Sequence, residues 1–269
     1  MPAPATDRLT REPEKARHYA FDPLVRGGWA TLVGVLGEGE AARFASETAL
    51  LWVRPDAVAA GVAEDVLARV GAAGFTPVGA SAVRLERAGV RALWWWHLRR
   101  ATAERLLLLD AVVELGPGLL VLYRHSGGDA ARRLTSLKGG NDPAGRRADS
   151  LRSVAGSPNR LLTMVHTSDD PLDVVRELAV FLPWRERAAL VASAHVPSPG
   201  GSQAVVQAPL AAVLAAYPDP ANGRPRTPSR NGRRRRGGRR SRSSCAVSTR
   251  RVPASGGRRW SGGRGRSRC

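Results

Sequence analysis

One stretch of the chain, residues 161–171, constrains its fold more than any other. It reads Leu-Leu-Thr-Met-Val-His-Thr-Ser-Asp-Asp-Pro, an apolar run that ends on His166 and meets helix-start signals at once. Asp170 suits the N-cap, Pro171 suits the first helical position, and Asp173 supplies the acidic partner of a capping box. The pattern therefore predicts a strand that leads directly into a helix. His166 is then either a half-exposed residue at a strand end or a group that meets an anion beside the free N–H groups of the helix start.

The positive charge of the chain is concentrated near its end. Residues 222–269 hold 17 Arg and no acidic residue, so they account for 17 of the formal +19 and leave residues 1–221 close to neutral. Their Arg, Gly, Ser and Pro content predicts a disordered tail, because it offers little apolar surface to bury. Such a tail would bind nucleic acid electrostatically and without sequence choice. Wrong-frame translation of GC-rich DNA yields the same composition, so an extension without function is the alternative.

Cysteine usage and hydropathy exclude several classes of protein. Both cysteines, Cys245 and Cys269, lie in the basic tail, so residues 1–221 can hold neither a disulfide framework nor a cysteine metal site. The N-terminus lacks the apolar segment of a signal peptide, and no apolar run reaches the length of a membrane span. We therefore expect a cytoplasmic protein that does not bind membranes.

Apolar patterns between residues 48 and 187 predict a small α+β domain. Residues 48–54 form a nearly continuous apolar run, typical of a central strand, and further strands are predicted at 75–85 and 119–123. Helices are predicted at residues 57–70, 86–109 (two in succession), 127–137 and from Pro171 onward. Four strands connected through helices favour a ferredoxin-like split βαβ sandwich, in which helices cover a four-stranded antiparallel sheet.

Two segments of this region stand out by their composition. Residues 94–96 are three adjacent tryptophans, which cannot all face one core from a helix, so at least one should be exposed or line a cleft. The alternative is that they close a core edge or an oligomer contact. Residues 138–158 lack apolar periodicity, and a loop of that length is usually functional or disordered.

Among residues 1–221, His166 is the main candidate for a reactive group. No phosphate-binding loop motif, dinucleotide-type glycine motif, His/Cys metal cluster or nucleophile elbow occurs. Arginines stand upstream at strand and loop ends, namely Arg54, Arg133 and Arg152. Phosphoryl transfer needs a placed nucleophile and cations along the phosphates, and an arginine fork can hold phosphate oxygens bidentately. Glu177, two helical turns past the cap, could reach back to the imidazole and fix its tautomer.

Residues 47–187 resemble the nucleoside diphosphate kinases, and the likeness rests on six short matches in order. They are Arg54-Pro-Asp56 after the first strand, Gly116-Pro117 before the third, Asn141-Asp-Pro143-Ala in the long loop, Leu151-Arg152, His166-Thr-Ser168-Asp169, and Glu177 eleven residues after His166. Arg133 matches, by its distance from Gly116, the arginine that precedes the family's nucleotide loop.

The resemblance implies a phosphohistidine mechanism. His166, Ser168 and Glu177 would form the catalytic group, and the nucleotide phosphates would meet Arg54, Arg133, Arg152 and Thr163. The enzyme would move the γ-phosphoryl of a nucleoside triphosphate to a nucleoside diphosphate. Mg²⁺ would be bound through the phosphates, without a protein metal site, and the family usually forms homo-oligomers.

Several departures favour a second interpretation. Arg54 replaces the family lysine, Thr163 replaces the asparagine three residues before the histidine, and Gly139 or Gly140 replaces a phosphate-binding threonine. Ser153 and its neighbours replace the Gly-Asp-Phe that follows the family's Ile-Arg. The chain is therefore either a phosphotransferase or a catalytically degenerate nucleotide-binding or scaffold domain.

The flanking regions complete the predicted organisation. Residues 1–46 form an N-terminal extension, disordered over 1–20 and with one or two helices over 21–46. Residues 47–187 form the kinase-like domain, and residues 188–221 a linker with an uncertain helix, followed by the tail of residues 222–269.

Overall fold

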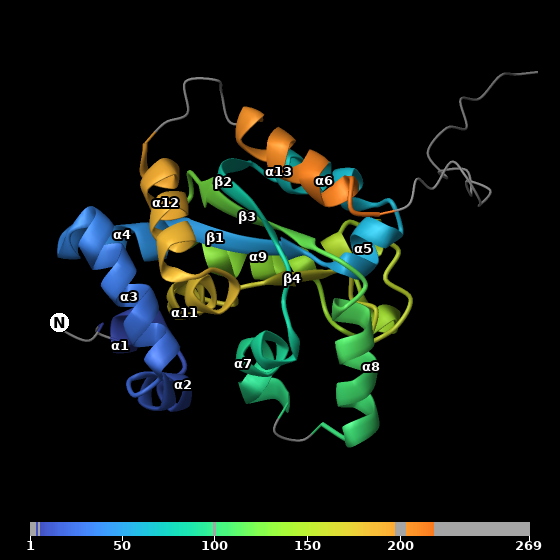
Figure 1. The fold of residues 1–269 in the computed structure, drawn as a ribbon, viewed down its shortest axis with the longest axis horizontal. Helices are drawn as coiled ribbons and strands as arrows, with labels where there is room; N and C mark the ends of the chain where they lie inside the picture. Colours follow the sequence, from blue (N-terminus) through green and yellow to red (C-terminus); the bar gives the residue numbers. More distant parts are fainter. Residues whose placement is uncertain (1–3, 5, 99–100, 197–202, 218–269) are drawn as a thin grey trace, which may run out of the picture. The chain divides into compact units, whose positions relative to one another are not determined.

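The computed structural model describes residues 4, 6–98, 101–196 and 203–217, without the side chains of Trp96 and His97 (Figure 1). The predicted tail and its disorder lie outside these residues. The described residues all belong to one compact unit.

A four-stranded sheet forms the centre of the fold (Figure 1). Its strands are β1 (Thr48–Val53), β2 (Phe75–Val83), β3 (Gly118–His125) and β4 (Val165–Thr167), in the order β2-β3-β1-β4. Every neighbouring pair is antiparallel. This is the ferredoxin-like arrangement that the sequence predicts. The continuous apolar run of β1 explains its place in the interior, because all six of its residues are buried.

The strand that carries His166 is shorter than predicted. It begins at Val165 rather than near residue 161, and it pairs with β1 over three residues, with His166 opposite Trp52. Met164 lies just before it with φ +63°, in the left-handed region, and donates its N–H to Asp56 Oδ2 over 3.1 Å. The left-handed backbone at Met164 prevents residues 161–164 from continuing the strand.

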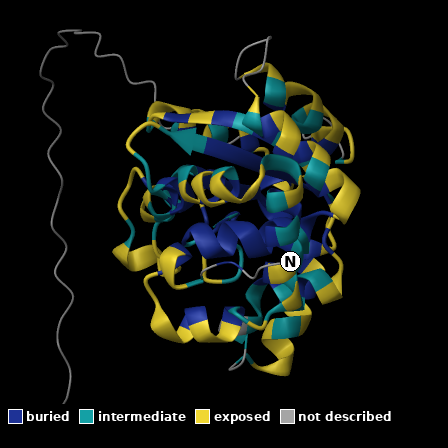
Figure 2. Cartoon of the chain, turned by 90° about the vertical axis from the view of Figure 1, so that its left-hand side faces the viewer, coloured by how far each residue is buried: buried dark blue, intermediate teal, exposed yellow. Residues whose placement is uncertain are grey.

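The two faces of the sheet carry separate cores. Alternate residues of the strands point to opposite faces. Leu50 and Trp52 belong to one cluster, together with Leu172, Val175 and other residues of α11 (Pro171–Phe181). The second cluster joins the other face of the sheet to helices that include α5 (Pro55–Ala59), α6 (Ala63–Ala72) and α13 (Ala204–Leu214). Figure 2 shows the buried residues concentrated inside the molecule, with exposed residues on the outer helices.

The N-terminal extension folds onto α11. It forms α1 (Thr6–Leu9), α2 (Pro13–Tyr19), α3 (Pro23–Leu36) and α4 (Glu38–Glu47). The prediction of disorder is therefore wrong for α1 and α2. The physical reason is a long-range ion cluster, in which the buried Lys15 donates to Asp170 over 3.0 Å and to Asp173 over 2.8 Å. Gly28 lets α3 approach α11 closely, since a Cβ at that position would collide with the carbonyl oxygen of Val175.

The remaining elements connect the strands or follow the last of them. Two helices lie between β2 and β3, as predicted, namely α7 (Arg87–Leu98), which is kinked at Trp94, and α8 (Ala103–Val113). After β3 come α9 (Ala130–Lys138), the short 3₁₀ turn η1 (Pro143–Gly145), α10 (Leu151–Val154) and, beyond α11, α12 (Trp184–His195). The predicted loop of residues 138–158 thus contains two short helical turns. Among the described helices, none combines the length and hydropathy needed to cross a membrane.

Candidate active site

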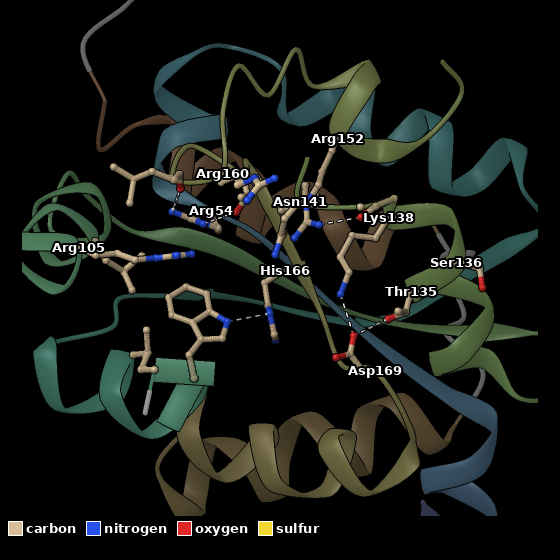
Figure 3. Close-up of a pocket in the computed structure, with 18 residues that line it drawn as sticks. Arg54, Arg105, Thr135, Ser136, Lys138, Asn141, Arg152, Arg160, His166 and Asp169 are labelled. Atoms are coloured by element: carbon tan, nitrogen blue, oxygen red, sulfur yellow. Dashed lines mark hydrogen bonds and ion pairs between the residues drawn. The ribbon is translucent and has the colours of Figure 1, made fainter. Parts of the chain in front are cut away.

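A cavity of about 580 Å³ opens beside His166 (Figure 3). Its wall carries five cationic side chains, Arg54, Arg105, Lys138, Arg152 and Arg160, and one carboxylate, Asp169. In the view of Figure 3, Arg105 and Lys138 lie on opposite sides of His166. Another part of the wall is apolar and consists of Trp94, Leu98, Leu109 and Leu161. The cavity therefore offers a cationic region next to an apolar one, which suits a ligand with an anionic and a less polar part.

Both ring nitrogens of His166 have close neighbours. Nε2 lies 2.9 Å from Glu177 Oε1, and Nδ1 accepts a hydrogen bond of 3.2 Å from the indole Nε1 of Trp94. An indole N–H can only donate, so Nδ1 must present its lone pair. In the neutral imidazole the ring proton must then sit on Nε2, on the side of Glu177. The geometry thus fixes the tautomer, with Nδ1 as the nitrogen able to attack.

Ser168 forms a hydrogen bond to the second carboxylate oxygen of Glu177. Its Oγ donates to Glu177 Oε2 over 2.5 Å, and both residues are buried. Ser168 does not belong to the cavity wall. The three predicted catalytic residues therefore form one chain of contacts, in which His166 faces the cavity and Ser168 orients the carboxylate of Glu177.

Arg54 is held tightly at the end of β1. Its Nη1 donates to Thr163 Oγ1 over 2.5 Å, and its Nε lies 3.2 Å from Asp56 Oδ1. Burial lowers the pKa of the Arg54 guanidinium, against the opposing charge of Asp56. The group also lies over the ring of Trp94, 5.5 Å from its centroid. Arg54 and Thr163 both reach the cavity, where Arg54 can still offer N–H groups that its present partners do not use.

Arg152 has few negatively charged groups near its guanidinium. Its Nη1 donates to the carbonyl of Gly139 over 2.7 Å, while its buried Nε has no hydrogen-bond partner. Burial, followed by the charges of Arg146 and Arg54, lowers the pKa of Arg152 to about 10. A buried guanidinium among other cations is stabilised by an anion, so this part of the wall favours a phosphate-like ligand.

Arg133, in contrast, lies outside the cavity. Its Nε and Nη2 donate to the carbonyls of Gly128 and Gly127, over 2.9 and 3.1 Å. Farther along α9, Thr135 and Lys138 reach the cavity instead. The sequence interpretation missed Arg105, Lys138 and Arg160. The helical spacing of Lys138 from Thr135 is a signal that could have placed both on one face, whereas Arg105 and Arg160 come from distant segments.

Asp169 neutralises part of the positive charge of the cavity wall. It accepts from Lys138 Nζ over 2.9 Å and from Thr135 Oγ1 over 3.2 Å. Burial would raise the pKa of Asp169, but the charge and hydrogen bond of Lys138 outweigh it, so the pKa is lowered overall and the carboxylate stays ionised. Within the described residues, no group of three or more His, Cys, Asp or Glu side chains could hold a metal ion.

Comparison with known sequences identifies the family. The family model described as nucleoside diphosphate kinase matches residues 47–187, slightly more than half of the chain. A nucleoside diphosphate kinase of Nitrosomonas europaea is 33% identical over 147 residues, which are 53% of this chain and 96% of that protein. One from Sorangium cellulosum is 28% identical over 137 residues, 51% of this chain and 91% of that protein.

Two solved structures are also similar. A crystal structure of the Aquifex aeolicus nucleoside diphosphate kinase has a TM-score of 0.44 at 22% identity, over 50% of this chain and 93% of that one. The Halobacterium salinarum enzyme in complex with CDP has a TM-score of 0.42 at 21% identity, over 54% of this chain and 98% of that one. On the match of the family model and the identity to the Nitrosomonas europaea protein, the chain belongs to the nucleoside diphosphate kinase family.

Proposed function

We propose that this protein transfers the γ-phosphoryl group of a nucleoside triphosphate to a nucleoside diphosphate through a phosphohistidine on His166. Membership of the family supports the reaction class. The observation that supports the proposal is the position of His166, whose side chain lines a cation-rich cavity while its Nδ1 presents a lone pair to Trp94 and its Nε2 lies 2.9 Å from Glu177. A nucleophile with a fixed tautomer and cations around it are the two parts that phosphoryl transfer requires.

The reaction would proceed in two half-steps. In the first, the Nδ1 lone pair attacks the γ-phosphorus, the bond from that phosphorus to the bridging oxygen breaks, and the diphosphate leaves with the bonding electrons. The imidazole becomes positively charged, and Glu177 stabilises it through the Nε2 proton. In the second, a terminal β-phosphate oxygen of another nucleoside diphosphate attacks the same phosphorus. The P–N bond then breaks, and its electrons return to Nδ1.

The cationic wall would hold the phosphates. Arg152 is the strongest candidate, because its buried Nε has no hydrogen-bond partner. Arg54 would contribute its remaining N–H groups, and Thr163 would orient Arg54 through their hydrogen bond. We add Arg105, Lys138 and Arg160 to this set because they line the same cavity, and we leave Arg133 out because it does not.

Magnesium would enter as part of the substrate. A Mg²⁺ ion bound to the triphosphate would neutralise charge that develops on its oxygens. The cavity wall provides one carboxylate for such an ion, Asp169, which is already paired with Lys138. This donor set fits an ion that the nucleotide brings with it rather than a resident one.

A second candidate function has one observation in its favour. The indole of Trp94 occupies Nδ1 of His166, and Arg54 is engaged by Thr163 and Asp56. A site arranged in this way is also compatible with a domain that binds nucleotides without turnover.

Incubation with γ-labelled ATP and Mg²⁺ separates the two functions. We expect an acid-labile, base-stable label on the wild-type protein and none on His166→Ala. If calorimetry detects nucleotide binding but the wild type stays unlabelled where a control kinase is labelled, the phosphotransferase proposal is wrong and the binding domain is favoured.

A further inference from the structure

The indole of Trp94 competes with the phosphoryl group for the same lone pair. Its Nε1 donates to His166 Nδ1 over 3.2 Å, the contact drawn as a dashed line at His166 in Figure 3. The two rings meet edge to face, with 5.7 Å between centroids. A lone pair that accepts a hydrogen bond cannot attack phosphorus until the donor withdraws.

We propose that Trp94 is a latch on His166, which an incoming nucleotide must displace before phosphoryl transfer. The proposal rests on the function proposed above and deepens it. The backbone around Trp94 gives the latch a point of movement. Trp94 has φ −111° and ψ 20°, so α7 is not regular at this residue, and the helix carries a kink where the donor is placed.

Arg54 couples the latch to the phosphates. Its guanidinium lies 5.5 Å from the centroid of the Trp94 ring, a distance at which a cation is attracted to an aromatic face. The same guanidinium is a candidate ligand for the phosphates. An anion bound to the guanidinium would compete with the ring for its charge, weaken this attraction and free the indole to leave His166.

The N-terminal extension is linked to α7 through Arg176. Arg176, buried on α11, donates through Nη2 to the carbonyl of Ala92 over 2.7 Å, two residues before Trp94. Its Nε donates over 2.7 Å to Asp22, which lies in the extension outside the family match. The guanidinium also lies 5.1 Å from the ring centroid of Tyr19. Asp22 and Arg176 are therefore positioning residues that fix α7, and with it Trp94, against His166.

The test measures the availability of the His166 lone pair directly. Diethyl pyrocarbonate acylates an unprotonated imidazole nitrogen and needs no kinase activity. The rate at His166 is followed by peptide mass spectrometry in the full chain, with His125, whose Nδ1 accepts from Gly127 N over 2.9 Å, as an internal reference. Trp94→Phe removes the donor and keeps a ring. Trp184→Phe makes the same change at an exposed tryptophan outside the cavity.

We expect Trp94→Phe to react about fivefold faster at His166, the factor for loss of one net hydrogen bond, with no change at His125. Asp22→Asn should raise the His166 rate in the same direction, and Trp184→Phe should leave it unchanged. Phosphohistidine formation at subsaturating Mg·ATP should rise in Trp94→Phe as well.

An unchanged or slower His166 reaction in Trp94→Phe overturns the latch, and so does an equal rise at His125, which would indicate general loosening. A faster acylation at His166 without any phosphohistidine in either protein leaves the latch intact and contradicts the proposed kinase function instead.

Discussion

The imidazole of His166 and the carboxylate of Glu177 meet across 2.9 Å although they lie on different elements, at β4 and on α11. The connection between these elements sets this distance. Asp170 caps α11 by accepting from the N–H of Asp173 over 3.1 Å, so the helix starts at Pro171, five residues after His166, and its second turn returns to the strand end. The local sequence thus places His166 and Glu177 together.

Replacing Glu177 by Gln should slow phosphohistidine formation on the order of 100-fold, because the neutral amide cannot stabilise the imidazolium that forms. Single-turnover labelling with γ-labelled ATP measures this rate, and nucleotide affinity should change little, since Glu177 does not belong to the cavity wall. Glu186→Gln, at an exposed position on α12, is the matched control. Equal labelling rates in both variants would remove Glu177 from the proposed mechanism.

Arg152 and Arg133 offer a second matched pair. Arg152→Leu should weaken nucleotide binding by about tenfold or more, the loss expected for a hydrogen bond to a charged group. Arg133→Leu should leave binding unchanged, because its guanidinium is bonded to the backbone outside the cavity. Calorimetric titration with a nucleoside diphosphate and Mg²⁺ compares the two. A larger loss in Arg133→Leu would support the assignment made from sequence spacing instead.

Local patterns predicted the sheet well. The apolar runs around Leu50 and Leu120 indicate buried strands, and the order of strands and helices favours the ferredoxin-like topology that is observed. Capping signals around Asp170 predicted where α11 begins and hence that Glu177 could reach His166, whereas Ser168 was added only through the resemblance to the family. These features depend on residues close together in the sequence.

The parts that the sequence did not predict depend on distant contacts. Lys15 pairs with residues more than 150 positions away, and no local pattern in a polar, proline-punctuated segment indicates that it will be buried. The position of Arg133 was inferred from its distance to Gly116, and such a count cannot tell which face of α9 meets the cavity. The contact of Trp94 with His166 lies at the kink in α7, and neither was predicted from the sequence.

Lys15→Met should destabilise the protein by about 3–5 kcal/mol, because it leaves the buried carboxylate of Asp170 without its cation and removes the hydrogen-bond donor to Asp173. Arg11→Met breaks another ion pair of the extension, with Asp129, but the Arg11 side chain is 78% exposed, so the cost should stay below about 1 kcal/mol. Urea denaturation gives both free energies of unfolding. Similar values for the two variants would mean that α2 contributes little to the docking of the extension on α11.

The same cluster should make stability depend on pH through Asp173. Burial, followed by the charges of Asp170 and Glu177, raises the pKa of Asp173 to about 8, whereas an exposed Asp in the unfolded chain has a pKa of about 4. Between these values the folded state holds a proton that the unfolded state has released, so stability falls as pH rises through this window, by up to about 1.4 kcal/mol per pH unit. Asp173→Asn should lose less stability than the wild type between about pH 5 and pH 8. Urea denaturation at both pH values tests this, and identical pH dependence in the two proteins would show that Asp173 is already ionised in the folded state.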